Sequence, residues 1–206
     1  MENIEKAFYH DGFQLGIKAT DDTGFSEQGI FNGLIQMYAA IDELNDSLFD
    51  FAKKQRQPIH CRKGCSWCCH QPIFALDYEL DFLKNHIQNH FSVAEQKAIR
   101  QRAAEKNNKL KSLENDALIN SKHPCPLLKN ATCMAYDARP VACRIYLSTN
   151  VNSCMKFFNE PEDKTSFPAL LDFPMRAGRM MNEGFNAALR SNGLVSKEFR
   201  IEEKLI

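Results

Sequence analysis

Two blocks of cysteine constrain this chain more than any other feature of its sequence. The first block holds Cys61, Cys65, Cys68 and Cys69, and the second holds Cys125, Cys133, Cys143 and Cys154. The 55 residues between the blocks are expected to form two helices. Antiparallel helices would return the chain to its starting end, so we expect the two blocks to meet.

The cellular compartment decides what clustered thiols are for. The N-terminus, MENIEKAFYHDGFQLG, has no basic segment followed by an apolar one, so no secretory signal is visible. No stretch approaches the roughly 18 apolar residues of a membrane span. We therefore expect a cytoplasmic protein without a membrane span. Thiols stay reduced there, which favours metal or redox chemistry over a disulfide knot.

The spacing of the first block is typical of a metal knuckle. Two residues separate Cys65 from Cys68, which lets two thiolates on one tight turn converge on a single ion. Gly64 stands where such a turn needs an unhindered backbone. Adjacent Cys68 and Cys69 must point in different directions. One can bind the metal while the other faces a second metal or the core.

The second block is too widely spaced for a knuckle and suits single ligands delivered by separate loops. Thiolates best fit a soft metal, either zinc or an iron–sulfur cluster. Four thiolates leave a net negative charge, so nearby cations and hydrogen-bond donors matter. Tyr136, Arg139 and Arg144 lie among the second-block cysteines and are candidates for that supporting role.

Other interpretations of these residues stay open. An isolated cysteine such as Cys125 or Cys154 can be an ordinary small apolar residue of the core. A histidine beside the cysteines could complete a metal site. The remaining interpretation is a redox pair of Cys65 and Cys68, but that needs a βαβ context, which the sequence does not predict.

The hydrophobic pattern predicts a mainly α fold with an irregular, metal-stapled, cysteine-rich centre. Residues 1–25 should form a short helix or loop. A long amphipathic helix is expected over 26–57, ended by Pro58, on a stripe of apolar residues three and four apart. The stripe is typical of a core-facing helix. Its alternative role is a seam for a protein partner or a homodimer.

Further helices are expected after the first block. One follows Asp77 as N-cap, and a solvated outer helix follows the Ser92–Glu95 capping box over 93–113. A last helix should begin near Pro174 and end before Gly193 as C-cap, followed by a short helix or edge strand. The segments are then an N-terminal helical extension (1–57), a cysteine-cluster region with a helical insert (58–160) and a C-terminal helix and tail (161–206). Together they are expected to form one compact domain.

The charge balance gives no support for a nucleic-acid partner. Lysine and arginine total 26, and aspartate and glutamate also total 26. A nucleic-acid binder should show a basic excess or a basic stripe. The partner expected from the sequence is a metal ion or cluster.

Taken together, the motifs resemble the YkgJ-type cysteine-cluster proteins, described as zinc- or iron-chelating domains with a CxxCxxCC signature. The similarity lies in CRKGCSWCC and in the later CPLLKNATCMAYDARPVACRIY. In the second element, the matching positions are Cys125-Pro126, Cys133, Tyr136, Arg139-Pro140 and Cys143-Arg144.

This resemblance implies metal binding through the cysteines and leaves the reaction open. A related cluster occurs in the flagellin lysine methylase, so the alternative is a metal-dependent enzyme of redox or methyl-transfer chemistry. Our ligand prediction begins with Cys61, Cys65 and Cys68. Cys133, Cys143 and Cys69 follow, and Cys154 and Cys125 come last.

Overall fold

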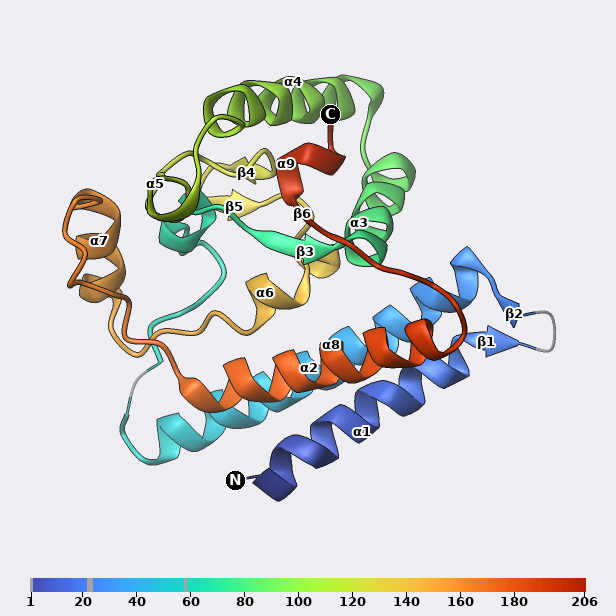
Figure 1. Ribbon diagram of the computed structural model, residues 1–206. Coiled ribbons are helices and arrows are strands. Elements are labelled where there is room, and N and C mark those ends of the chain that lie inside the picture. The colour runs from blue at the N-terminus through green and yellow to red at the C-terminus, as the bar shows by residue number, and fades with distance from the viewer. Residues whose placement is uncertain (1, 22–23, 58) are drawn as a thin grey trace. The chain divides into compact units, whose positions relative to one another are not determined.

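Figure 1 shows the computed structural model, which describes residues 2–21, 24–57 and 59–206. The chain folds into two compact units, and both are built from separated segments. The first unit contains Met1–Ile59, Val141–Leu147 and Leu171–Lys197. The second contains His60–Pro140, Ser148–Leu170 and Glu198–Ile206.

Helices packed along their lengths make up the first unit. Its elements are α1 (Glu2–Lys18), the hairpin β1 (Thr20–Asp21) and β2 (Gly24–Phe25), α2 (Glu27–Lys54), α6 (Val141–Arg144) and α8 (Asp172–Ser191). Helices α1, α2 and α8 lie side by side (Figure 1). Glycines allow α1 and α8 to approach closely, since a Cβ at Gly12 would fall 1.9 Å from the Met181 carbonyl oxygen.

Helix α2 corresponds to the long amphipathic helix expected over 26–57. The Ser26 hydroxyl caps it by accepting a hydrogen bond from the Gly29 amide. The helix ends at Lys54, and Pro58, which was expected to end it, lies outside the described residues. Leu34, Met37 and Ile41 are fully buried, so this part of the stripe faces the core.

The second unit contains the cysteine blocks among short elements. They are η1 (Trp67–His70), β3 (Phe74–Leu76), α3 (Asp77–His90), α4 (Val93–Leu110), α5 (Asn115–Ile119), β4 (Leu128–Lys129), β5 (Thr132–Cys133), η2 (Tyr136–Ala138), α7 (Val151–Asn159), β6 (Glu198–Arg200) and α9 (Ile201–Lys204). β3 pairs antiparallel with β6 in the register Ala75 to Phe199. Both α3 and α4 pack against α9. The tail therefore forms both a strand and a helix.

Two details of the insert helices differ from the sequence prediction. The N-cap of α3 is Leu76, and Asp77 is the first helical residue, where its carboxylate accepts from the Tyr78 amide. The predicted outer helix α4 has its Ser92–Glu95 capping box, but it ends at Leu110 and is not simply solvated. It buries Lys106 because the Glu202 carboxylate lies 3.5 Å from its ammonium group.

The predicted C-terminal helix is present as α8. It begins at Asp172, slightly before Pro174, and ends in the turn that Gly193 allows. Gly193 has φ +87°, its amide donates to the Arg190 carbonyl, and the Leu194 amide donates to the Leu189 carbonyl. This is the Schellman arrangement, which satisfies carbonyl groups at a helix C-terminus.

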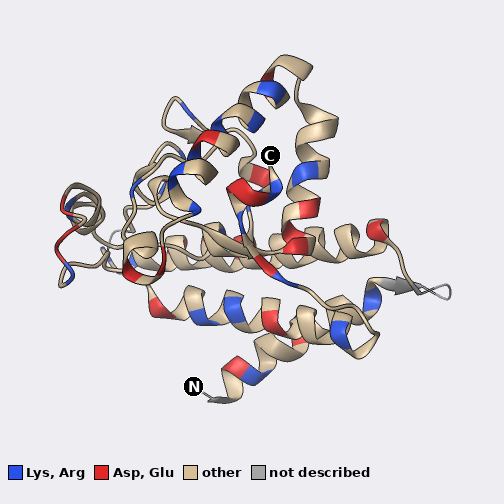
Figure 2. Cartoon of the chain, turned by 45° about the horizontal axis from the view of Figure 1, so that its top comes forward, with Lys and Arg blue, Asp and Glu red and all other residues tan. Residues whose placement is uncertain are grey.

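The mainly α prediction is confirmed, and the cysteines lie on short elements and the loops between them. The strands are short pairs rather than an extended sheet. Figure 2 shows lysine and arginine interspersed with aspartate and glutamate along the helices. Across the residues that the structure describes, no helix is both long and apolar enough to cross a membrane.

Candidate metal centre

A tight turn shapes the start of the first cysteine block. The Cys65 amide donates a 3.0 Å hydrogen bond to the Arg62 carbonyl, and Gly64 has φ +95° at the third position of this turn. That conformation is typical of a type II turn and is strained for any residue with a Cβ. The glycine predicted to form a tight turn before Cys65 does so. The chain then enters the short helix η1, which carries Cys68 and Cys69.

Ser148, in the loop before α7, hydrogen-bonds to both His60 and Cys61. The His60 amide donates to the Ser148 carbonyl at 3.0 Å, and the Ser148 amide donates to Cys61 Sγ at 3.0 Å. The Val151 amide donates to His60 Nδ1 at 3.0 Å, so this imidazole caps the start of α7. His60 Nδ1 is therefore already used as a hydrogen-bond acceptor for the first amide of α7.

Aromatic packing fixes α7 against η1. The Phe158 ring lies 5.3 Å from the Trp67 ring and 4.8 Å from the His70 ring, measured between centroids. His70 Nδ1 lies 3.0 Å from the Ser66 carbonyl oxygen and must carry the proton, because that oxygen can only accept. This packing brings α7, and Cys154 with it, to the first cysteine block.

Four thiols of the second unit, those of Cys61, Cys65, Cys68 and Cys154, interact electrostatically and are called here the electrostatic group. Burial, opposed by the hydrogen bond from the Ser148 amide and assisted by the neighbouring thiols of Cys68, Cys65 and Cys154, raises the pKa of Cys61 from 9.0 to about 11. Burial also raises the pKa of Cys65, with contributions from Cys68 and Cys154. Cys154 therefore interacts electrostatically with Cys61 and Cys65, two of the three cysteines that head the ligand prediction.

The two cysteine blocks were expected to meet, and within the second unit their backbones are joined by hydrogen bonds. The Cys125 amide donates a 2.7 Å hydrogen bond to the Cys69 carbonyl, and the His123 amide donates to the His70 carbonyl at 2.8 Å. Cys133 follows on the β4–β5 hairpin, whose turn residues Asn130 and Ala131 both have positive φ. Primed turns of this kind match the twist of a two-residue hairpin.

Backbone amides donate to several of these sulfurs. Besides Ser148 to Cys61, the amides of Trp67, Leu127 and Ala135 hydrogen-bond to Cys65, Cys125 and Cys133, respectively. In each of these three pairs the donor lies two residues after the cysteine. Such donors stabilise a thiolate more than a thiol, and they tune thiolate-bound metals.

Cations gather around Tyr136 next to the thiols. The Arg139 guanidinium lies 3.7 Å from the Tyr136 ring centroid and donates to the Tyr136 carbonyl at 2.9 Å. The Lys63 ammonium lies 5.5 Å from the same centroid. A hydrogen bond from the Cys69 thiol lowers the pKa of Cys68, and the charge of Arg139 lowers it further.

The remaining predicted residues, Cys143 and Arg144, belong to the first unit. Both lie on α6, and Arg144 is almost fully buried there. Its guanidinium pairs with Asp42 and lies 4.1 Å from the Tyr38 ring centroid, while its carbonyl accepts from Asn45 at 3.1 Å. These contacts give Arg144 a role in the packing of α2 and α6.

The cysteines could serve as metal ligands, because they are free thiols and several of their sulfurs accept hydrogen bonds from backbone amides. All eight lie in the described part of the chain, and none forms a disulfide. Among residues 2–21, 24–57 and 59–206, no three histidine, cysteine, aspartate or glutamate side chains are positioned to hold an ion. The donor set fits a soft metal, and binding would require the thiols to turn toward one point.

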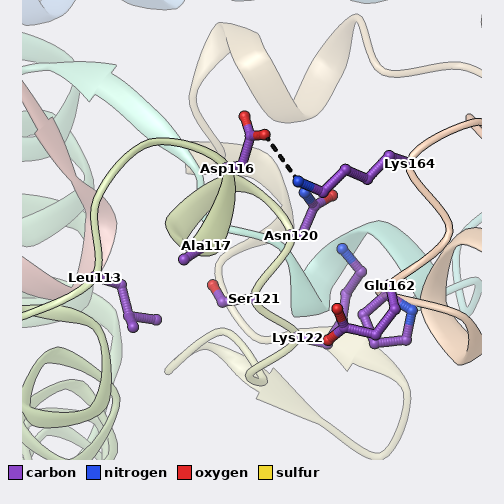
Figure 3. Close-up of a pocket in the computed structure, with 9 residues that line it drawn as sticks. Leu113, Asp116, Ala117, Asn120, Ser121, Lys122, Glu162 and Lys164 are labelled. Atoms are coloured by element: carbon purple, nitrogen blue, oxygen red, sulfur yellow. Dashed lines mark hydrogen bonds and ion pairs between the residues drawn. The ribbon is translucent and has the colours of Figure 1, made fainter.

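A pocket in the second unit is chemically distinct from the cysteine region. It has a volume of about 430 Å³ and is lined by residues of α5, of the segments on either side of α5 and of the loop after α7: Leu113, Asp116, Ala117, Asn120, Ser121, Lys122, Pro161, Glu162 and Lys164. Figure 3 shows the ion pair between Lys164 and Asp116 on this lining, whose charged atoms lie 3.3 Å apart. The lining contains no cysteine or histidine, so it does not belong to a thiolate centre.

Comparison with known families agrees with this chemistry. Residues 60–165, just over half of the chain, match the family model described as "CxxCxxCC: Putative zinc- or iron-chelating domain". The chain belongs to the CxxCxxCC family. The searches of curated proteins and of solved structures found no match. The resemblance to a cysteine-cluster family is therefore confirmed, and with it zinc or iron chelation as the family's described function.

The CxxCxxCC match includes all of the cysteines, but sequence reasoning missed several groups around them. The Ser148 amide carries no motif signal, and His60, which the sequence offered as a metal ligand or a turn residue, instead accepts a hydrogen bond from the first residue of α7. Lys63 stands inside the first block, and its alignment with the Tyr136 ring depends on the turn at Gly64. No spacing in the sequence indicates such contacts.

Proposed function

We propose that this CxxCxxCC protein binds a soft metal, as an iron–sulfur cluster, iron or zinc, through thiolates of its second unit. The observation that supports this most strongly is the electrostatic group of Cys61, Cys65, Cys68 and Cys154. Four thiols would complete a tetrahedral site or hold one cluster. Cys154 thereby moves to the head of the ligand set, beside the three cysteines of the first block.

The surrounding groups match the charge of such a centre. A thiolate site is negative, and the charge of the Arg139 guanidinium helps to lower the pKa of Cys68 and offsets part of the rise that burial causes in the pKa of Cys133. Amide donors from Ser148 and Trp67 face two of the four sulfurs. These residues would favour the deprotonated thiols that a metal requires.

The adjacent pair Cys68 and Cys69 would divide its work. The Cys69 thiol donates to Cys68, so Cys68 is the acceptor and the better thiolate. The Cys69 carbonyl accepts from the Cys125 amide and connects the two blocks. In this proposal Cys68 binds the metal, while Cys69 orients it and supports the second block.

The number of thiols beyond four supports the choice of metal that we propose. Cys125 and Cys133 are the further thiols of the same unit, and the Cys133 thiol interacts electrostatically with that of Cys68. This surplus favours an iron–sulfur cluster in the cell, with zinc as a substitute during expression. A bound cluster would supply electron transfer or Lewis acidity, and zinc would supply a structural cross-link.

Anaerobic purification with metal and sulfide analysis tests the proposal. Wild-type protein should contain iron and acid-labile sulfide, with visible absorbance and an EPR signal after reduction. Cys65→Ser should lower the metal content well below one equivalent. Ser66→Ala, at the neighbouring position, is the matched control and should retain the metal.

Two results would contradict the ligand set. Full metal content in both Cys65→Ser and Cys154→Ser would exclude the four-thiol group. Loss of metal in Cys143→Ser, with the fold retained by circular dichroism, would show that the second unit's thiols are insufficient. If protein purified anaerobically contains zinc but no iron or acid-labile sulfide, the iron–sulfur cluster is excluded. The proposed thiolate site would then stand as a zinc site.

A further inference from the structure

Two histidines occupy one face of α3, outside the cysteine blocks. His86 and His90 are four residues apart, the spacing that places two side chains together on a helix. Their rings are stacked, with centroids 4.3 Å apart and planes 19° from parallel. His90 is exposed and His86 is half-buried, so solvent reaches the pair from one side.

Hydrogen bonding leaves one ring nitrogen of His90 ready to bind a metal. Its Nδ1 lies 2.9 Å from the His86 carbonyl oxygen. A carbonyl oxygen can only accept, so Nδ1 carries the proton and Nε2 keeps a lone pair in the neutral ring. Metal-binding histidines in proteins commonly have this arrangement, with the second nitrogen bonded to a carbonyl or carboxylate.

A carboxylate from another element lies near the pair. Asp137 on η2 interacts electrostatically with His86, and α3 packs against η2. Burial and the neighbouring His90 lower the pKa of His86, which favours its neutral imidazole. The same Asp137 carboxylate interacts with Cys133. The pair thus lies beside the thiol region on the protein surface.

We propose that His86 and His90 form a second metal site, for a divalent ion such as zinc that favours imidazole, supported by the charge of Asp137. Two imidazoles at this spacing on a helix are a known way to hold zinc. The site differs from the thiolate centre in ligands, exposure and softness. Two protein imidazoles leave the remaining positions to water, so the ion should exchange readily.

Histidine side-chain NMR on the full chain tests this site. Protein whose thiols are already saturated with metal is titrated with Zn²⁺ while the imidazole ¹⁵N and ¹H signals are followed. The signals of His86 and His90 should shift together and saturate at the same zinc concentration. His10, an exposed histidine on α1 with no histidine four residues away, should not follow them.

Single substitutions separate a shared ion from independent binding. His86→Ala and His90→Ala should each weaken zinc binding at the remaining histidine by at least tenfold, and Asp137→Asn by about tenfold. His10→Ala is the matched control and should change nothing. Circular dichroism checks that the His86 variant folds, and the exposed His90 keeps the test valid if it does not.

The opposite results overturn the proposal. If His90 binds zinc equally well in wild type and in His86→Ala, the two histidines do not share an ion. Absence of any shift below about 1 mM zinc would exclude the site. An unchanged affinity in Asp137→Asn would remove Asp137 from it. None of these readouts depends on the thiols binding a particular metal.

Discussion

Replacing Glu202 with glutamine should destabilise the second unit strongly. The Glu202 carboxylate has no solvent exposure, and it lies 3.5 Å from the Lys106 ammonium and 3.4 Å from Arg200 Nε. The strand β6 and the helix α9 join at this point, so the network connects the tail to α4. Glutamine keeps the size of the side chain and removes the charge.

The expected cost follows from the burial of the cations. Removing one partner of a buried ion pair costs about 3–5 kcal/mol, because the other charge stays desolvated. Arg200 keeps its partners, since its guanidinium lies 2.6 Å from Glu203 and donates to Asn107 at 3.0 Å. Lys106 keeps only its 3.3 Å hydrogen bond to the Gln71 carbonyl among the contacts described here. We therefore expect a loss of about 3 kcal/mol.

Urea unfolding of the metal-free, reduced protein measures this loss. Trp67, the single tryptophan of the chain, lies in the second unit, so its fluorescence reports that unit. Glu160→Gln is the control, because the Lys156–Glu160 pair is about half exposed on both sides and should be worth less than about 1 kcal/mol. A loss below about 1 kcal/mol in Glu202→Gln would refute the reasoning.

Three further predictions concern the cysteine region. Burial raises the pKa of Cys125 from 9.0 to about 11, so the folded state holds its proton more tightly than the unfolded state. Metal-free protein should therefore lose on the order of 2–3 kcal/mol of unfolding free energy as pH rises from 9 to 11, and Cys125→Val should flatten this dependence. Gly64→Ala should weaken metal binding and cost about 1 kcal/mol or more at φ +95°, whereas Gly193→Ala at φ +87° should cost stability and spare metal affinity in a competition titration. Arg139→Gln should raise the pKa of Cys68, seen as slower thiol alkylation at pH 7; an unchanged rate would show that Arg139 does not act on this thiol.

The helices could be predicted from the sequence where a periodic pattern and a cap coincide. Ser92 caps its helix as the capping box indicated, and Ser26 caps the helix that the apolar stripe alone predicted. The burial of Lys106 could not be predicted, because it depends on Glu202, almost one hundred residues later. Periodicity treats a lysine as exposed, and only the tertiary fold supplies the buried partner.

In the candidate site, too, local features could be predicted from the sequence and long-range contacts could not. The spacing of Cys65 and Cys68 and the glycine before them predict the local turn, which forms as expected. The spacing gave Cys154 a low rank, because ten residues separate it from Cys143. Its association with Cys61 depends on the packing of Phe158 on Trp67, a contact between aromatic residues that no cysteine spacing encodes.

The pairing of β3 with β6 has a consequence for how the protein is made. The second unit needs Glu198–Ile206, yet α8 of the first unit precedes this segment in the chain. During synthesis, residues 60–165 leave the ribosome before β6 has been made. The edge of β3 is therefore unpaired when all of the cysteines have already been synthesised. A fragment cut at the limits of family similarity would stay in that unfinished state, because the unit of homology is not the unit of folding.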